Sequence, residues 1–89
     1  MTTVIMTHKV GNMETWLSGR SNRKPAFDLF CKSYRTFRHT EDDRVSIVCE
    51  DVDLAKMEEV LGSPEAAKSK EADTVVEPID VFVEIEGGG

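Results

Sequence analysis

Four segments of the chain alternate apolar and polar side chains with a period of two, and this pattern constrains the fold more than any other feature. The first three segments span residues 3–10, 34–40 and 45–50, and the last covers residues 79–85 after a short piece at 74–76. Successive side chains of a strand point to opposite faces, so a period of two predicts β-strands. The chain is therefore expected to contain four strands.

Two stretches with helical spacing separate these strands. One covers residues 13–32 with Asn12 as its N-cap. Gly19 and residues 21–24 are expected to interrupt it directly before Pro25, because proline suits the first turn of a new helical piece. The other covers residues 54–72 and is expected to stop and restart at Ser63, which would cap the second piece. Each helical stretch is thus predicted as a broken helix.

The elements follow one another in the order β-α-β-β-α-β. The acidic residues 41–43 form the turn of a hairpin between the second and third strands, and Pro78 marks an edge or a bulge in the last strand. This order predicts an α+β, ferredoxin-like sandwich, in which one four-stranded antiparallel sheet carries both helices on one face. We expect a single domain over residues 1–86 and a flexible glycine tail at 87–89.

Both faces of the predicted sheet contain apolar side chains. The face toward the helices is expected to carry Val4, Met6, His8, Val10, Val45, Ile47, Cys49, Ile79, Val81, Val83 and Ile85. The opposite face carries Ile5, Phe37, Val48 and Phe82, which is too apolar for a face covered only by water. A domain of 89 residues also has a marginal core of its own. We therefore expect a homodimer whose sheets pack face to face through these four side chains.

The net charge of −6 is unevenly distributed along the chain. Residues 1–40 contain seven Lys/Arg and two Asp/Glu, whereas residues 41–89 contain four Lys/Arg and fifteen Asp/Glu. An acidic chain repels phosphate backbones, so no nucleic-acid partner is expected. The basic group of the first half is a solvated surface, a site for an anionic ligand or a contact with the acidic half of another chain. Its members are Arg20, Arg23, Lys24, Lys32, Arg35 and Arg38.

Several kinds of site and location are disfavoured by composition and spacing. No apolar run approaches the roughly 18–20 residues that span a bilayer, and the first residues lack a signal-peptide pattern, so no membrane partner is expected. Two cysteines, Cys31 and Cys49, are too few for a disulfide scaffold, which favours a reducing cytoplasm. The two histidines lack metal-ligand spacing and the glycines form no phosphate-binding loop, so neither a metal nor a cofactor is expected.

Nearly the whole chain resembles the dimeric α+β-barrel superfamily, close to its small antibiotic-biosynthesis-monooxygenase-like and cyclase-like members. The similar stretches are His8-Lys9-Val10 followed by Trp16, then Tyr34 to Arg38, Arg44-Val45, Glu50 to Lys56, and Ser63-Pro64-Glu65 through Ala72 to Glu77-Pro78. The resemblance implies a ferredoxin-like chain that forms a dimeric α+β barrel. Because the superfamily includes cofactor-independent oxygenases, haem-degrading enzymes, isomerases and proteins without an assigned role, it implies no single activity.

The candidate catalytic residue is His8, which the alternation places on the helix side of the first strand. A polar side chain there needs a partner, and histidine titrates near neutral pH, so His8 either transfers protons or binds a ligand, or else it is a hydrogen-bonded structural residue. The expected ligand pocket lies between sheet and helices and is lined by His8, Trp16, Phe27, Phe30, Cys49 and Met57.

Two functions remain open at this point. The first is a cofactor-independent monooxygenase-like or cyclase-like enzyme, in which a small aromatic or polyketide-like substrate itself activates oxygen. The second is a non-catalytic dimer that binds a small molecule or a protein partner. An open cavity that exposes His8 favours the enzyme, whereas a pocket filled by Trp16, Phe27, Phe30 and Met57 favours the binding module.

Overall fold

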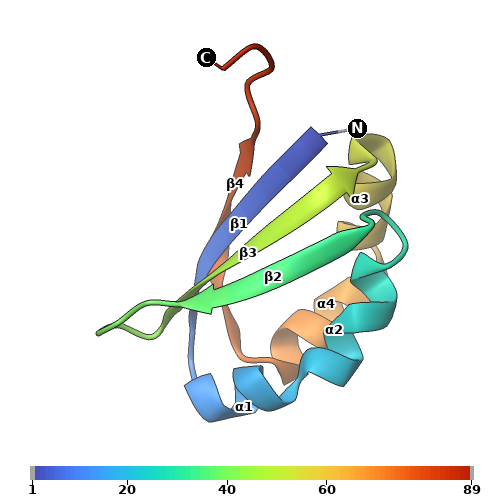
Figure 1. Ribbon diagram of the computed structural model, residues 1–89. Helices are drawn as coiled ribbons and strands as arrows, with labels where there is room; N and C mark the ends of the chain where they lie inside the picture. Colours follow the sequence, from blue (N-terminus) through green and yellow to red (C-terminus); the bar gives the residue numbers. More distant parts are fainter. Residues whose placement is uncertain (1, 89) are drawn as a thin grey trace.

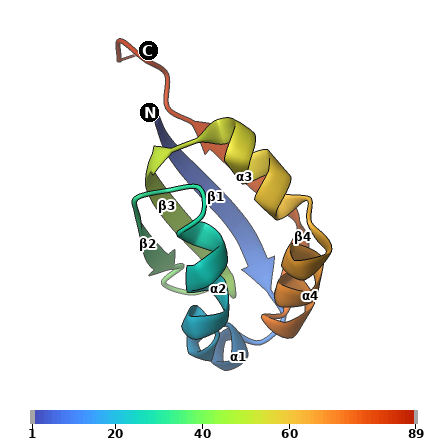
Figure 2. The same cartoon turned by 90° about the vertical axis from the view of Figure 1, so that its right-hand side faces the viewer.

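The computed structural model describes residues 2–88 as a four-stranded antiparallel sheet with four short helices on one face (Figure 1). The strands lie in the order β2-β3-β1-β4. Figure 2 shows the helices in front of the sheet, and in Figure 1 no helix or strand of residues 2–88 covers the opposite face. The elements are β1 (Thr2–Val10), α1 (Met13–Ser18), α2 (Arg20–Phe27), β2 (Ser33–Arg38), β3 (Arg44–Val52), α3 (Leu54–Leu61), α4 (Pro64–Ala72) and β4 (Val75–Val83).

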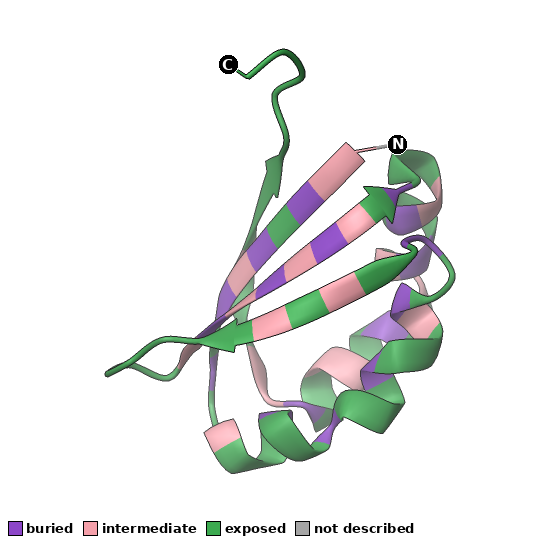
Figure 3. Ribbon diagram, in the orientation of Figure 1, coloured by how far each residue is buried: buried purple, intermediate pink, exposed green. Residues whose placement is uncertain are grey.

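This architecture confirms the predicted ferredoxin-like α+β fold, with each helical stretch divided in two. Buried positions alternate with more exposed ones along β1 and β3 (Figure 3). The side chains that these central strands bury beneath the helices are Val4, Met6, His8, Val10, Val45, Ile47 and Cys49. Each fully buried aliphatic side chain among them contributes roughly 1.5–3 kcal/mol, so the period-two pattern of the sequence accounts for the centre of the core.

The first helical stretch is interrupted at Gly19, as predicted, but the helix resumes at Arg20, so the predicted break directly before Pro25 is wrong. A Cβ atom on Gly19 would lie 2.8 Å from Asp73 Cγ, so the chain can pass this carboxylate only without a side chain. Pro25 instead lies inside α2, where its missing N–H removes one helical hydrogen bond, and the helix ends at Phe27. Residues 28–32, which the spacing predicted as helix, lie outside α2.

Side-chain caps fix the starts of α1 and α4 as predicted. Asn12 Oδ1 accepts a hydrogen bond from the backbone N–H of Thr15 at 3.0 Å, which caps α1. Ser63 Oγ accepts one from the N–H of Ala66 at 3.2 Å, and Pro64 begins α4. The stop and restart of the second helical stretch is therefore confirmed.

The acidic segment 41–43 connects β2 and β3, which pair as the expected hairpin. His39 orders this turn, since its Nδ1 accepts hydrogen bonds from the N–H groups of Glu41 (3.0 Å) and Asp42 (2.9 Å). β2 ends before His39, two residues earlier than predicted, because His39 and Thr40 belong to the turn.

Side chains in the second half of β4 are exposed on both faces of the sheet, so this part of the core was predicted wrongly. Ile79 packs against the core, but Val81, Val83 and Ile85 are exposed. Val81 and Val83 pair with buried positions of β1, so they have the expected orientation. They remain exposed because β4 is an edge strand, which has a neighbouring strand on one side only.

A bulge interrupts the pairing of β1 with β4 beside His8. Thr7 pairs with Asp80 and Lys9 pairs with Val76, so three residues of β4 lie opposite the single residue His8. A bulge of this kind bends the strand and redirects side chains. The irregularity expected at Pro78 is therefore present, and it lies directly beside the candidate catalytic residue.

The ends of the chain lie partly outside the described residues. Met1, which begins the predicted domain, and Gly89, which ends the predicted tail, are not described. Gly87 and Gly88 follow β4 outside any helix or strand and have φ values of +82° and +81°, which glycine adopts readily. The boundary at residue 86 stays a prediction.

Candidate functional site

A cavity lies between the helix-covered face of the sheet and the helices. Its volume is about 80 Å³, and most of its lining is apolar. All four helices contribute to it, together with β1, β3 and β4. Its titratable and aromatic lining residues are His8, Trp16, Arg23, Phe27, Lys70 and Asp73.

His8 reaches the cavity from β1 as a neutral base. Its Nδ1–H donates a hydrogen bond to the backbone carbonyl of Lys9 at 2.8 Å, which leaves Nε2 as the ring nitrogen with a free lone pair. Burial lowers the pKa of His8 below its usual 6.5; the positive charge of Arg23 lowers it further, while the Lys9 hydrogen bond and Asp73 oppose the shift. His8 is therefore unprotonated at neutral pH and can accept a proton or a hydrogen bond.

Trp16 forms the side of the cavity next to His8. The rings of His8 and Trp16 meet edge to face, with centroids 6.2 Å apart and planes at 69°. Trp16 is only 1% exposed, and the guanidinium carbon of Arg23 lies 3.9 Å from the centre of its ring. This distance is within the range of a cation–π interaction. Arg23 and Trp16 thus form one stacked unit in the cavity wall.

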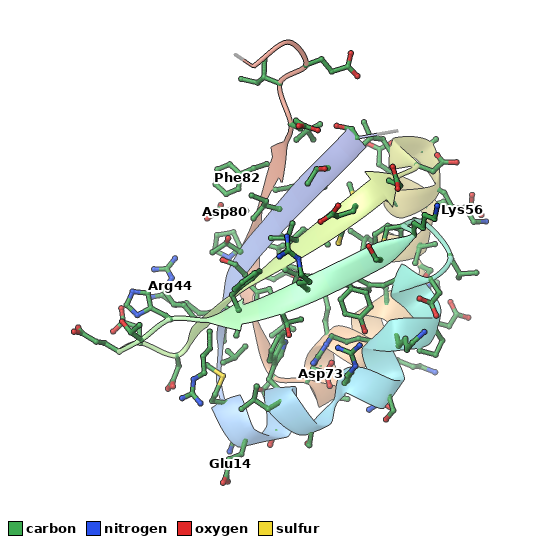
Figure 4. All side chains as sticks on the ribbon, viewed as in Figure 1. Glu14, Arg44, Lys56, Asp73, Asp80 and Phe82 are labelled. Atoms are coloured by element: carbon green, nitrogen blue, oxygen red, sulfur yellow. The ribbon has the colours of Figure 1, made fainter. Side chains whose placement is uncertain are left out.

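Arg23 is held in place by a buried ion pair with Asp73. Arg23 Nη1 donates to Asp73 Oδ2 at 2.9 Å and to the backbone carbonyl of Trp16 at 2.7 Å. The two charged side chains are only 9% and 3% exposed. Figure 4 shows Asp73 on the helix side of the sheet, at the end of α4.

The sequence analysis did not find this ion pair. Arg23 was only one member of the basic group, for which a solvated surface, an anionic ligand or a contact with another chain was expected, and Asp73 was not singled out. The partners are fifty residues apart, so no local spacing connects them. The available signal was Gly19, whose lack of a side chain makes room for Asp73.

The other residues of the predicted pocket divide into two sets. Phe27 lines the cavity together with His8 and Trp16, whereas Phe30, Cys49 and Met57 are buried in the surrounding core. Burial, together with the neighbouring Cys31, raises the pKa of the Cys49 thiol to about 12. Cys49 is therefore a protonated, unreactive core residue.

Residues 2–88 were also searched for a metal site and for a membrane-spanning helix. No group of three or more His, Cys, Asp and Glu side chains is arranged to hold a metal ion. None of the helices described is long and apolar enough to cross a membrane.

The uncovered sheet face brings together the four residues predicted for a dimer interface. Strand register places Ile5 directly between Val48 and Phe82, and Phe37 lies on the same face beside Ser46. Ile5, Phe37 and Phe82 are 39%, 48% and 57% exposed, while Val48 is partly buried. Figure 4 shows Phe82 and Asp80 pointing away from the helices. The face is thus an apolar surface that no part of residues 2–88 covers.

The chain's sequence matches no protein-family model and no curated protein. Solved structures do match it. One is a protein from Bordetella bronchiseptica, provisionally described as an antibiotic biosynthesis monooxygenase, with 18% identity, a TM-score of 0.74 and coverage of 96% of this chain and 95% of that one. A protein from Nitrosomonas europaea with the same provisional description has 12% identity, a TM-score of 0.69 and coverage of 99% and 93%.

A third structure with this provisional description comes from Caulobacter crescentus, with 15% identity, a TM-score of 0.64 and coverage of 93% and 86%. Each match covers nearly the whole of both chains, while the identities are low. The similarity therefore concerns the fold, and it agrees with the resemblance seen in the sequence. This chain has the fold of the antibiotic-biosynthesis-monooxygenase-like proteins.

Proposed function

We propose that this protein is a monooxygenase-like or cyclase-like enzyme that acts on a small aromatic or polyketide-like molecule in the cavity between sheet and helices. The observation that carries the proposal is a neutral His8, with a free Nε2, in the wall of an apolar cavity. The fold shared with provisionally described monooxygenases supports the same class of reaction.

His8 would act as the general base. Its Nε2 would take a proton from a CH₂ or OH group that an adjacent carbonyl or aromatic ring makes acidic. The electron-rich substrate would then react with molecular oxygen directly. When a CH₂ group becomes a carbonyl, one oxygen atom stays in the product and the other leaves as water with the two hydrogens, so no external reductant is needed.

The size of the cavity limits the substrate. An engineered apolar cavity of about 150 Å³ holds benzene, whereas this cavity has about 80 Å³. A polycyclic molecule cannot enter completely unless α4 moves. We therefore propose that only the reactive end of the substrate enters, while the rest extends past Lys70 at the edge of the cavity.

A non-catalytic binding module is the second candidate. Trp16 and Phe27 occupy much of the cavity wall, and the remaining volume is small. This observation favours a protein that binds a small molecule or a protein partner without changing it. The two candidates differ in one property, which is whether His8 is needed for turnover or only for binding.

We also propose that the protein is a homodimer in which the apolar sheet faces pack together through Ile5, Phe37, Val48 and Phe82. Fully covering a side chain of this size contributes about 1.5–3 kcal/mol. Three of the four are 39–57% exposed, so each would gain a fraction of that value. Eight such side chains in two chains would still offset the cost of association, which is several kcal/mol.

The charged residues on the uncovered sheet face favour a second copy of this chain as the partner that packs on it. Arg35 and Arg44 lie on the β2–β3 side of the face, and Asp80 and Glu84 lie on the β4 side. A two-fold axis along the strands would place β2 of one chain over β4 of the other. Opposite charges would then meet and fix the register of the two sheets.

A reducing, cytoplasmic location is part of the proposal. Cys31 and Cys49 are both free and buried, and burial raises the pKa of both thiols. Free thiols are typical of proteins in reducing compartments.

The test of the enzyme proposal pairs two histidine variants. Aromatic and carbonyl compounds are screened by thermal shift, and compounds that bind are then tested for oxygen consumption. We expect His8→Gln to keep binding within a few-fold and to lose oxygen consumption. His39→Gln makes the same chemical change at the exposed turn and should leave both unchanged. Equal oxygen consumption by His8→Gln and the wild type would exclude His8 as the base.

A further inference from the structure

Helix α4 covers the cavity but contributes little to the core. Among the described residues, Ala66 is the one side chain of α4 that is buried. Ser69 and Lys70 also line the cavity and are partly buried, while the rest of the helix is exposed. The neighbouring helix α3 has nearly the same length but buries Met57 and Val60. Because burial of apolar surface is the main force that holds a helix on a sheet, α4 is held weakly.

Open space lies on both sides of the contact between α4 and α2. On the inner side is the cavity of about 80 Å³, and on the outer side a groove of about 450 Å³ runs between α2, α3 and α4. Figure 2 shows α2 and α4 side by side over the sheet. Ala26 of α2 and Ala66 and Ser69 of α4 line both spaces. Since these side chains are small, they bury little surface between the two helices, and displacement of α4 would join the cavity to the groove.

Hydrogen bonds fix both ends of α4. At its start, Ser63 Oγ donates to the backbone carbonyl of Val60 at 2.6 Å, which ties α4 to the end of α3. After its end, Thr74 Oγ1 accepts a hydrogen bond from the N–H of Asn12 at 3.0 Å, and the Thr74 carbonyl accepts one from the N–H of Gly11 at 2.7 Å. The helix between these two points can therefore leave the sheet while its ends stay in place.

The ion pair of Arg23 with Asp73 holds the C-terminal end of α4 against α2. Asp73 follows the last residue of α4, and its Oδ2 lies 2.9 Å from Arg23 Nη1. Both charges lost their hydration when the pair became buried, which offsets much of the attraction between them. When α4 moves away from α2, both charges return to water together. The ion pair can therefore break without leaving a single buried charge.

We propose that α4 is a lid over the cavity, latched by the Arg23–Asp73 ion pair and opened by local unfolding between residues 63 and 74. A nine-residue helix that leaves its neighbours does not stay helical, because isolated helices of this length are marginal in water. The opening enlarges a cavity of about 80 Å³, which is smaller than the roughly 150 Å³ that holds benzene. The inference rests on the proposed function, since the lid admits the substrate proposed for this cavity, but the lid is tested without a ligand.

Hydrogen exchange in the free protein tests the lid. Amide exchange is followed by NMR for each residue at several low urea concentrations, with correction for the intrinsic rates. We expect the amides of residues 68–72 in α4 to exchange at least about 100-fold faster than those at the centres of β1 and β3. They should share one opening free energy that depends little on urea, because a local opening exposes little surface.

Helix α3 is the matched control within the same chain. It lies beside α4 and has nearly the same length, but two of its side chains belong to the core. Its amides should therefore exchange at least about 10-fold more slowly than those of α4.

Two variants at the C-terminal end of α4 test the latch. Asp73→Asn removes the charge that pairs with Arg23, so it should speed the exchange of α4 by at least about 10-fold. Glu71→Gln makes the same chemical change at an exposed position and should alter these rates by less than about 3-fold.

Three results would overturn the inference. Exchange of α4 with the opening free energy and urea dependence of β1 and β3 would mean that α4 opens only when the whole chain unfolds. Rates that rise steadily from the middle of α4 to both ends would indicate fraying of a short helix instead of a lid. Both results need only the wild type, so they hold even if Asp73→Asn fails to fold. The third is an Asp73→Asn variant that exchanges faster in the sheet but not in α4.

The proposed function fails or holds separately from the lid. If α4 opens locally but His8→Gln consumes oxygen like the wild type, the lid stands and His8 is not the base. If α4 opens only with the whole chain while His8 is needed for oxygen consumption, the lid is refuted and the enzyme proposal stands.

Discussion

Replacing Asp73 with Asn tests whether the buried ion pair holds the cavity wall together. The substitution keeps the shape of the side chain and one oxygen acceptor but removes the negative charge beside Arg23. Arg23 then remains in a position where its side chain is 9% exposed, without a counter-ion. Water cannot compensate for that charge unless the helices separate from the sheet.

The expected loss follows from this burial. Removing one partner of a buried ion pair costs about 3–5 kcal/mol, and the acceptor that Asn retains favours the lower end. A domain of this size has a free energy of unfolding of about 5–15 kcal/mol. A loss of about 3 kcal/mol would lower the Tm by roughly 12–24 °C, at about 4–8 °C per kcal/mol.

Urea unfolding followed by circular dichroism measures the effect at a fixed protein concentration. The control is Glu59→Gln, which breaks an exposed pair with Lys56 on α3 and should cost less than about 0.5 kcal/mol. A double variant, Arg23→Met with Asp73→Leu, removes both charges and should recover stability relative to Asp73→Asn. A loss below about 1 kcal/mol for Asp73→Asn would refute the reasoning, since it would mean that Arg23 reaches water without cost.

Three further predictions concern pH, packing and assembly. Burial lowers the pKa of His8 below 6.5, so the unfolded chain binds the proton more readily. The free energy of unfolding should therefore fall as pH decreases from about 7.5 to 5, and His8→Gln should remove this part of the pH dependence in urea titrations. Gly19→Ala should cost about 1–3 kcal/mol by thermal unfolding, because its Cβ would collide with Asp73; Gly11→Ala, with its nearest atom 3.5 Å away, should cost far less. Phe82→Glu should convert a dimer to a monomer in sedimentation velocity, whereas Leu29→Glu, an equally exposed apolar position outside the uncovered face, should not. A wild-type chain that sediments as a monomer at micromolar concentration would contradict the dimer.

Most of the fold could be predicted from the sequence, because the decisive signals were local. Alternation in β1 and β3 identified the residues under the helices, and the caps at Asn12 and Ser63 identified two helix starts. The errors arose where tertiary contacts overruled local preference. Residues 21–24, which were predicted to interrupt the first helical stretch, are helical, and Arg23 among them is held by Asp73, fifty residues away in sequence.

The candidate site was only partly predictable for the same reason. His8, Trp16 and Phe27 follow from strand alternation and helical spacing, and all three line the cavity. The burial of Arg23 could not be predicted from the sequence, because a basic residue among other basic residues indicates a position on the protein surface. Only the three-dimensional structure shows its guanidinium against Trp16, with the Nε of one and the Nε1 of the other unpaired.

The central claim is that the cavity beside His8 and Trp16 binds a small aromatic ligand. Trp16 is the one tryptophan of the sequence, so its indole N–H gives a single resolved peak in a ¹H–¹⁵N correlation spectrum. Titration with 4-nitrophenol at neutral pH should shift this peak in a saturable way, because a ring bound beside the indole changes its chemical environment. An indole peak that stays in place at saturating probe concentration would contradict the account.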